Sequence, residues 1–395
     1  MTYSKGYGVS GWGLGVLAVA VLAGCGGSID LSKGAGGGGS GPGSSGSGGD
    51  SFHSGGRSGS ATGAGGLGAG GSTTDPHQVT PGPSSPAAPT KVVDDGVTLG
   101  TSDPSGGIFA FDANRGGAGR ALYLSTLDNP DCTRRITSPT VQAKQPVFSP
   151  DRVHLAYAAQ TDGTYQIHVL NLESGIVEQV TDLHYGATAP SYSPDGQKLA
   201  FITGDNDAAG GNPVEGLFDV MVLDLEAQTQ RVVLSSFERG CCVPNLRAPT
   251  FFNDDEIALS TGTELIAIDL QTFRVREVMP LSGRIPNPQD PSPAPDGERY
   301  AYADRCGGSL SLYIGRTDGS SGDSCVGATQ IPAQFEFVAP AWGPSGYIAA
   351  ARSDVPHGLV LFDDQTFEMT DLLGAEGGNN PAWAPTRVGL ALDCE

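Results

Sequence analysis

Thiols have the clearest chemical use in this sequence, which holds seven cysteines and six histidines among its 395 residues. Six of the cysteines lie after residue 100, and an even number in an exported chain is typical of disulfide bonds. Cys306 and Cys325 are the nearest pair that is not adjacent, while Cys132 and Cys394 lie near the two ends of this region. We take these four as disulfide candidates, although six cysteines allow fifteen pairings. No two cysteines have CxxC spacing, so we expect neither a zinc site nor a thioredoxin-type centre.

Carboxylates offer one weak metal-binding pattern. Asp205 and Asp207, within DNDAAG, are similar to the opening of a calcium-binding loop. The twelfth position is Gly216, however, where an EF-hand needs a glutamate that binds through both oxygens. The histidines show no HExxH or other ligand spacing, and no GxSxG nucleophile motif occurs. Apart from this calcium candidate, the sequence predicts no metal, no cofactor and no catalytic residue.

The amino terminus carries a further cysteine with a possible chemical role, Cys25. Lys5 precedes a run without charge from Gly6 to Gly24, which suits the core of a signal peptide and is short for a transmembrane helix. The residues LAGC that end at Cys25 resemble the lipobox of bacterial lipoproteins, in which a peptidase cuts before the cysteine and the thiol receives a lipid. The alternative is an ordinary signal peptide, with Cys25 in a disulfide bond.

That resemblance implies a palmitate-bearing lipoprotein of the cell envelope, held on a membrane by its lipid alone. In Gram-negative lipoproteins an aspartate after the lipidated cysteine usually retains the protein in the inner membrane. Here Gly26 follows Cys25, so the outer membrane is the expected location if the cell is Gram-negative.

Composition divides the rest of the chain in two. Residues 26–75 include 21 glycines and 11 serines. Such a segment has too few apolar side chains for their burial to offset the loss of chain entropy on folding. We therefore predict a signal peptide at 1–24, a lipidated cysteine with a disordered tether at 25–92, and one folded domain at 93–395. That domain holds 18 basic and 40 acidic residues, so it repels phosphate backbones and is not expected to bind nucleic acid.

A repeated turn motif predicts the fold of this domain. QPVFSPDRVHLAY at 145–157 and APSYSPDGQKLAF at 189–201 match almost without gaps, and weaker copies begin at Ala248, Asp290, Ala339 and Asn380. The residues at the proline position of the turn are 44, 59, 42, 49 and 41 positions apart. A period in the forties with β-rich sequence is typical of a propeller.

Each repeat predicts four antiparallel strands. The SPDG turn joins the first two, since proline and glycine suit a tight reversal, and the aromatic residue before it is expected to pack between blades. An alternating apolar strand follows, as in QIHVLNL from Gln166, and then a short one, as in EQVTD from Glu178. We predict an all-β propeller, most simply with six blades.

The first blade lacks its own turn motif. Segments at 107–113, 121–127 and 133–137 supply three strands, and the copy at Asn380 can supply the missing inner strand. Closure by strands from both ends removes exposed sheet edges. VGLALD at 388–393 then looks like a surplus strand, so seven blades remain an alternative.

These repeats resemble the PD40, or WD40-like, repeats of TolB-type propellers. The family resemblance implies a six-bladed propeller used chiefly to bind other proteins. The chain departs from TolB in its lipobox, and in having a Gly-Ser tether where TolB has an amino-terminal α/β domain.

Loops at 203–216, 235–249 and 284–290 should emerge on one face of the propeller, where ligands commonly bind. Their polar residues are our candidate binding residues: Asp205, Asp207, Arg239, Asn245, Arg247 and Arg284. The alternative is that these loops vary without function. We expect a protein-binding or scaffolding module whose partner is an envelope protein or glycan. The alternative function is a propeller enzyme, of the polysaccharide lyase or hydrolase type.

Overall fold

The chain divides into two units, Met1–Gly71 and Ser72–Glu395. The computed structural model describes part of the second: residues 80–81, 90–91, 107–115, 119–127, 133–138, 140–204, 218–235, 247–262, 264–279, 288–305, 310–321, 329–331, 336–344, 346–353, 358–372, 375 and 377–385. These residues form strands joined by turns and loops. Within them there is no helix with the length and apolar character that a membrane crossing requires.

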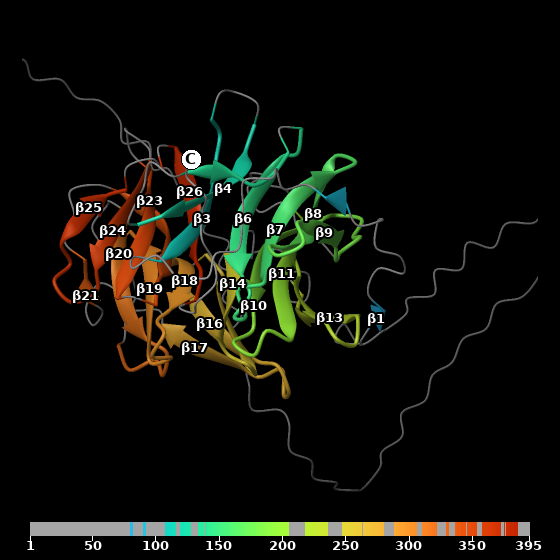
Figure 1. Cartoon of the computed structure of the whole chain (residues 1–395). Coiled ribbons are helices and arrows are strands. Elements are labelled where there is room, and N and C mark those ends of the chain that lie inside the picture. Colours follow the sequence, from blue (N-terminus) through green and yellow to red (C-terminus); the bar gives the residue numbers. More distant parts are fainter. Residues whose placement is uncertain are drawn as a thin grey trace, which may run out of the picture. The chain divides into compact units, whose positions relative to one another are not determined.

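Six antiparallel sheets form the blades of a propeller (Figure 1). Blade 2 contains β6 to β9: Ala143–Phe148, His154–Thr161, Thr164–Asn171 and Ile176–Gln179. Blade 3 contains β10 to β13: Ala187–Tyr192, Lys198–Thr203, Val220–Asp224 and Thr229–Leu234. Blade 4 contains β14 to β17: Arg247–Asn253, Glu256–Ser260, Leu265–Asp269 and Val275–Met279.

The remaining blades follow the same order, with the first strand innermost. Blade 5 contains β18 to β21: Gln289–Pro293, Arg299–Asp304, Ser311–Arg316 and Thr329–Gln330. Blade 6 contains β22 to β25: Phe337–Trp342, Tyr347–Arg352, Gly358–Asp363 and Met369–Asp371. Blade 1 contains β3 to β5, Ile108–Ala113, Ala121–Thr126 and Arg134–Arg135, behind an inner strand β26, Gly378–Trp383.

Blade 1 confirms the predicted closure. β26 pairs with β3 in the register Gly378 to Ala113 and Trp383 to Phe109, so the two ends of the domain meet in one sheet. Six blades of four strands are formed, as predicted. The segment at 388–393 that kept seven blades open lies outside the described residues.

The hydrophobic core lies between the blades. Six clusters of buried apolar side chains each join two neighbouring blades, and together they run around the whole ring. The predicted role of the aromatic residue before the turn is confirmed at five positions: Phe148, Tyr192, Phe251, Trp342 and Trp383. Blade 5 has Pro293 there instead, and Tyr300, Tyr302 and Tyr313 fill its interface with blade 4.

The SPDG-type turns join the first and second strands of blades 2 to 6, as predicted. In blade 3, Ser193 Oγ donates to Asp195 Oδ1 (2.5 Å) and accepts from the Lys198 N–H (2.9 Å). The same carboxylate accepts from the Gln197 N–H at 2.9 Å. Side chains of the motif therefore satisfy the backbone of the turn. We call the end of the propeller that carries these turns the turn face, and the opposite end the loop face.

Two very short strands extend the outer edges of blades 2 and 3. β1, Thr80–Pro81, pairs with β13, and β2, Thr90–Lys91, pairs with β9. Both lie within the range 25–92 that we predicted as tether.

Candidate functional site

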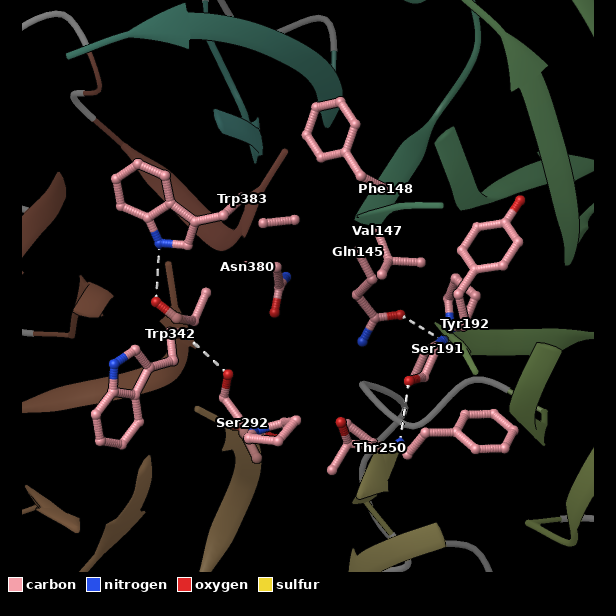
Figure 2. Close-up of a pocket in the computed structure, with 18 of the residues that line it drawn as sticks. Gln145, Val147, Phe148, Ser191, Tyr192, Thr250, Ser292, Trp342, Asn380 and Trp383 are labelled. Atoms are coloured by element: carbon pink, nitrogen blue, oxygen red, sulfur yellow. Dashed lines mark hydrogen bonds between the residues drawn. The ribbon is translucent and has the colours of Figure 1, made fainter. Parts of the chain in front are cut away.

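A cavity of about 400 Å³ lies at the centre of the propeller. It is lined by residues of the innermost strand of every blade: β6, β10, β14, β18, β22 and β26. Pro150, Pro194 and Pro385, from the turns or just beyond the strand end, also line it, so the cavity extends toward the turn face. Figure 2 shows the labelled side chains arranged around this central space.

Each inner strand contains an irregularity where it passes the cavity. All six show a register shift around an X-Pro dipeptide, which inserts extra residues opposite the second strand. Five of the residues before the proline have positive φ, between 45° and 55°: Gln145, Ala189, Asp290, Ala339 and Asn380. This backbone conformation is unusual for residues other than glycine, and proline disfavours it further in the preceding residue. Bulges of this kind redirect side chains and are common beside functional sites.

Hydrogen bonds between blades hold one half of this ring. The buried Asp112 of blade 1 accepts from the Gln145 N–H at 3.0 Å and from Asn380 Nδ2 at 2.8 Å through the same oxygen. Gln145 Oε1 in turn accepts from the Ala189 N–H of blade 3 at 3.0 Å. The N–H groups of Gln145 and Ala189, at two of the bulges, thus donate to side chains of the preceding blade.

The other half is held by hydroxyl groups and one indole. Ser191 Oγ accepts from the Phe251 N–H (3.4 Å), and Ser292 Oγ accepts from the Trp342 N–H (2.9 Å). Trp383 Nε1 donates to the Ala341 carbonyl at 2.9 Å, which joins blade 1 to blade 6 (Figure 2). These bonds link neighbouring inner strands at the cavity wall.

Acidic residues follow the turn prolines at the end of the cavity. Burial acts to raise the pKa of Asp151, but hydrogen bonds from Ser149 and the Val153 N–H outweigh it and leave the pKa below its usual value. The pKa of Asp195 is lowered in the same way, by Ser193 and the Gln197 N–H. Both carboxylates are therefore ionised at neutral pH. Each follows a proline that lines the cavity, and Asp195 Oδ2 lies 3.6 Å from Lys198 Nζ.

The chemistry of the wall suits binding. Prolines supply apolar surface, while Thr250, Ser292 and Asn380 supply hydroxyl and amide groups. A volume of about 400 Å³ lies at the lower end of the range for small-ligand sites, roughly 300 to 1,000 Å³. The cavity can hold a short segment of a partner, but not a folded domain.

One cluster superficially similar to a catalytic triad lies on the turn face. His154 Nδ1 is 3.6 Å from Asp151 Oδ2, and Ser149 Oγ donates to the other oxygen of that carboxylate. The serine thus bonds the aspartate directly and not the imidazole, as nucleophile activation would require. In blade 3 the equivalent of His154 is Lys198, with the same turn geometry. These contacts therefore stabilise the turn between β6 and β7.

Most of the binding residues predicted from the sequence lie outside the described part of the chain. This applies to Asp205, Asp207, Arg239, Asn245 and Arg284, and also to the seven cysteines, including Cys25, Cys132, Cys306, Cys325 and Cys394. Arg247 is the first residue of β14 and pairs with Ser260.

The described flanks of two of these loops do lie together. Asp219 donates its N–H to Thr203 Oγ1 (2.8 Å), and its carboxylate accepts from Ser235 Oγ at 3.0 Å. The loops that leave after Gly204 and after Ser235 therefore start from one point of blade 3, on the loop face. The role of the loops themselves stays a prediction.

Sequence reasoning missed the central cavity. Its signal was present in the motif copies, because an X-Pro dipeptide stands in each: QP at 145, AP at 189, AP at 248, DP at 290, AP at 339 and NP at 380. We aligned the copies on the later turn proline and the aromatic residue. A proline repeated in an inner strand argues for a bulge, since it cannot donate to the ladder.

Comparison with known proteins agrees with this architecture. The PD40 model, described as TolB beta propeller domain, matches residues 116–346. A TolB from Acinetobacter baumannii superposes with a TM-score of 0.54 at 18% identity, over 71% of this chain and 67% of that one. A putative TolB from Agrobacterium tumefaciens gives 0.50 at 16% identity, over 75% and 97%. A chain of a nidogen/laminin complex gives 0.54 at 8% identity, over 70% and 98%. No curated protein matches the sequence.

Proposed function

We propose that this chain, which belongs to the PD40 family, the TolB beta propeller domain, is a protein-binding module of the cell envelope. In this proposal a partner protein inserts a short extended segment into the central cavity. The observation that carries it is the ring of six bulged X-Pro dipeptides, which six blades hold at the cavity wall. Strained backbone lowers the stability of the fold, and the packing of the blades alone does not require it.

Charge narrows the class of partner. Asp151 and Asp195 stand beside the turn prolines that line the cavity, and their lowered pKa values keep them ionised. Asp290 adds a carboxylate to the wall. A segment with lysine or arginine fits this end of the cavity better than an acidic one, and electrostatic attraction would also speed the encounter.

The anchor and the loop face complete the proposal. A lipid on Cys25 would hold the protein on a membrane, the outer membrane if the cell is Gram-negative, and residues 26–92 would serve as a tether. The loops that carry Asp205, Asp207, Arg239, Asn245 and Arg284, with Arg247 at the start of β14, would form a second contact surface at the opposite end of the propeller. The proposed protein has no catalytic activity.

Photo-crosslinking in intact cells tests the cavity directly. A photoreactive amino acid at Thr250, which lines the cavity, is compared with one at Glu226, an exposed residue in the turn after β12. We expect a discrete envelope-protein adduct from position 250 that position 226 does not give. Equal adducts from both positions would contradict the cavity as the binding site. Turnover of an envelope polysaccharide by the purified protein would instead favour the enzyme, and saturable glycan binding without turnover would favour a glycan partner.

A further inference from the structure

The outer edges of two neighbouring blades are paired with residues from the amino-terminal side of the chain. Thr80 and Pro81 of β1 pair with Gln230 and Thr229 of β13 in blade 3. Thr90 and Lys91 of β2 pair with Val177 and Ile176 of β9 in blade 2. Figure 1 shows β1 beside β13, at the outer side of its blade.

The two pairings belong to one short stretch of chain. Eight residues separate β1 from β2, so the distance between the two contacts cannot exceed roughly 30 Å of extended chain. The outer strands of adjacent blades are neighbours around the ring, so one segment can reach both. Pro81 has no backbone N–H to donate. It is compatible with this position because one side of an added edge strand makes no hydrogen bonds to another strand.

Outer edges of a propeller are places where another strand can add. β9 is such an edge, and it carries Ile176, whose side chain is 42% exposed. Unprotected edges with apolar residues invite pairing between molecules. The chain covers two of its own edges by the same backbone pairing that a foreign strand would use.

We propose that residues 80–81 and 90–91 form a strap that docks the amino-terminal side of the chain on the rim of blades 2 and 3. The strap lies at the outer edges of the two blades. It leaves both the cavity mouth on the turn face and the loop face uncovered. The consequence for membrane attachment rests on the proposed lipid anchor, but the strap itself does not.

The strap should open without unfolding of the propeller. Only two residue pairs hold each contact, whereas β9 and β13 are also paired with the third strand of their own blade. Local opening of so few pairs is far more frequent than global unfolding. Protease access to the strap therefore measures the pairing.

Lys91 makes this measurement possible in the native sequence. Trypsin can cut after Lys91, in β2, and after Arg57, in the Gly-Ser tract. Each cleavage rate in the purified full chain is divided by the cleavage rate at the same bond in urea. This normalisation removes the preference of trypsin for one local sequence over another. We expect normalised cleavage at Lys91 to be at least about tenfold slower than at Arg57, because a paired segment must detach before it is cut. Equal normalised rates would overturn the proposal.

A matched pair of substitutions acts on the blade side. Ile176 is the register partner of Lys91, so Ile176→Lys places like charges directly opposite and Ile176→Glu places opposite charges there. We expect faster cleavage at Lys91 in Ile176→Lys than in Ile176→Glu, by roughly threefold to tenfold, with unchanged unfolding of the propeller. The same rate in both variants would refute the pairing with β9.

The second contact needs its own test. A photoreactive amino acid at position 80 should crosslink to the peptide that contains β13, and one at position 45 should not. No adduct from position 80 would refute the contact with blade 3. These experiments use purified protein without membrane or partner, so their outcome is independent of partner capture and of lipidation.

Discussion

Residues before the cavity prolines combine two features that disfavour each other. Ala339 has φ 48° and precedes Pro340, and Asn380 has φ 45° and precedes Pro381. The conformation persists because the freed backbone groups find partners in the preceding blade, as when Gln145 Oε1 accepts from the Ala189 N–H. The strain is thus balanced by contacts between blades, and it can be measured one residue at a time.

Glycine should be tolerated at one position of this ring and not at its neighbour. Ala339→Gly removes a side chain from a left-handed position, so we expect stability to be unchanged or raised by up to about 1 kcal/mol. Ala341→Gly, two residues later in β22, should lower stability by about 1 kcal/mol because glycine weakens an ordinary strand position. Urea unfolding measures both. A similar loss in the two variants would show that residue 339 is not strained.

The turn carboxylates should make stability depend on acid pH. Burial acts to raise the pKa of Asp195, but hydrogen bonds and Lys198 lower it below the ordinary value of 3.8. A lowered pKa in the folded state stabilises the fold above pH 3.8, and the contribution is lost as pH falls through the lower folded value. Asp195→Asn should therefore cost roughly 1 kcal/mol at pH 7 and close to nothing near pH 2. An equal cost at both pH values would contradict this assignment.

At the scale of the strands, the sequence predicted most of the fold. Proline, aspartate and glycine in the turn specify a tight reversal locally, and alternating apolar residues specify the strands. The fourth strand of blade 2 was predicted from Glu178 but is found at Ile176–Gln179. It ends early because Thr181 Oγ1, and not a backbone carbonyl, accepts from the Ile167 N–H at 2.8 Å. Such a replacement depends on the tertiary structure.

The cavity wall escaped prediction for a related reason. A positive φ before proline runs against the local preferences of both residues. It is accompanied by contacts with residues distant in the sequence, such as Asp112, which lies 33 residues before Gln145, in another blade, and 268 before Asn380, in its own blade. The spacing of residues within one repeat therefore does not predict those contacts.

The closing strand β26 should depend on its tryptophan in two separable ways. Trp383 is 8% exposed, packs 5.8 Å from Phe109, and donates its indole N–H to Ala341. Trp383→Phe keeps most of the packing and should cost about 1 kcal/mol for the lost hydrogen bond. Trp383→Ala should cost about 3 to 5 kcal/mol. Urea unfolding of both variants tests this, and a loss below 1 kcal/mol in Trp383→Ala would mean that closure does not rest on this residue.

At the scale of the whole molecule, charge and geometry bear on the same proposal. The domain carries a net charge of −22 from Val93 onward, and ionised aspartates stand beside the cavity. Partner capture from position 250 should therefore weaken when salt is raised from about 0.1 M to 1 M, since the Debye length falls from roughly 10 Å to 3 Å. Capture that is insensitive to salt would argue against a basic segment and for an apolar one.

Membrane attachment is the remaining property of the whole chain, and it rests on one thiol. If Cys25 carries the lipid, Cys25→Ala should move the protein from the membrane fraction to the soluble fraction of the envelope, because no other attachment is proposed. Cys132→Ala keeps Cys25 and should stay on the membrane, which controls for the loss of a thiol elsewhere. Retention of Cys25→Ala on the membrane would refute the lipid anchor. With the strap in place, about 54 residues of tether would remain, with a root-mean-square span of roughly 40 Å. Ile176→Lys should leave both the anchor and this span unchanged, because it opens only the pairing of β2 with β9 while β1 stays paired with β13.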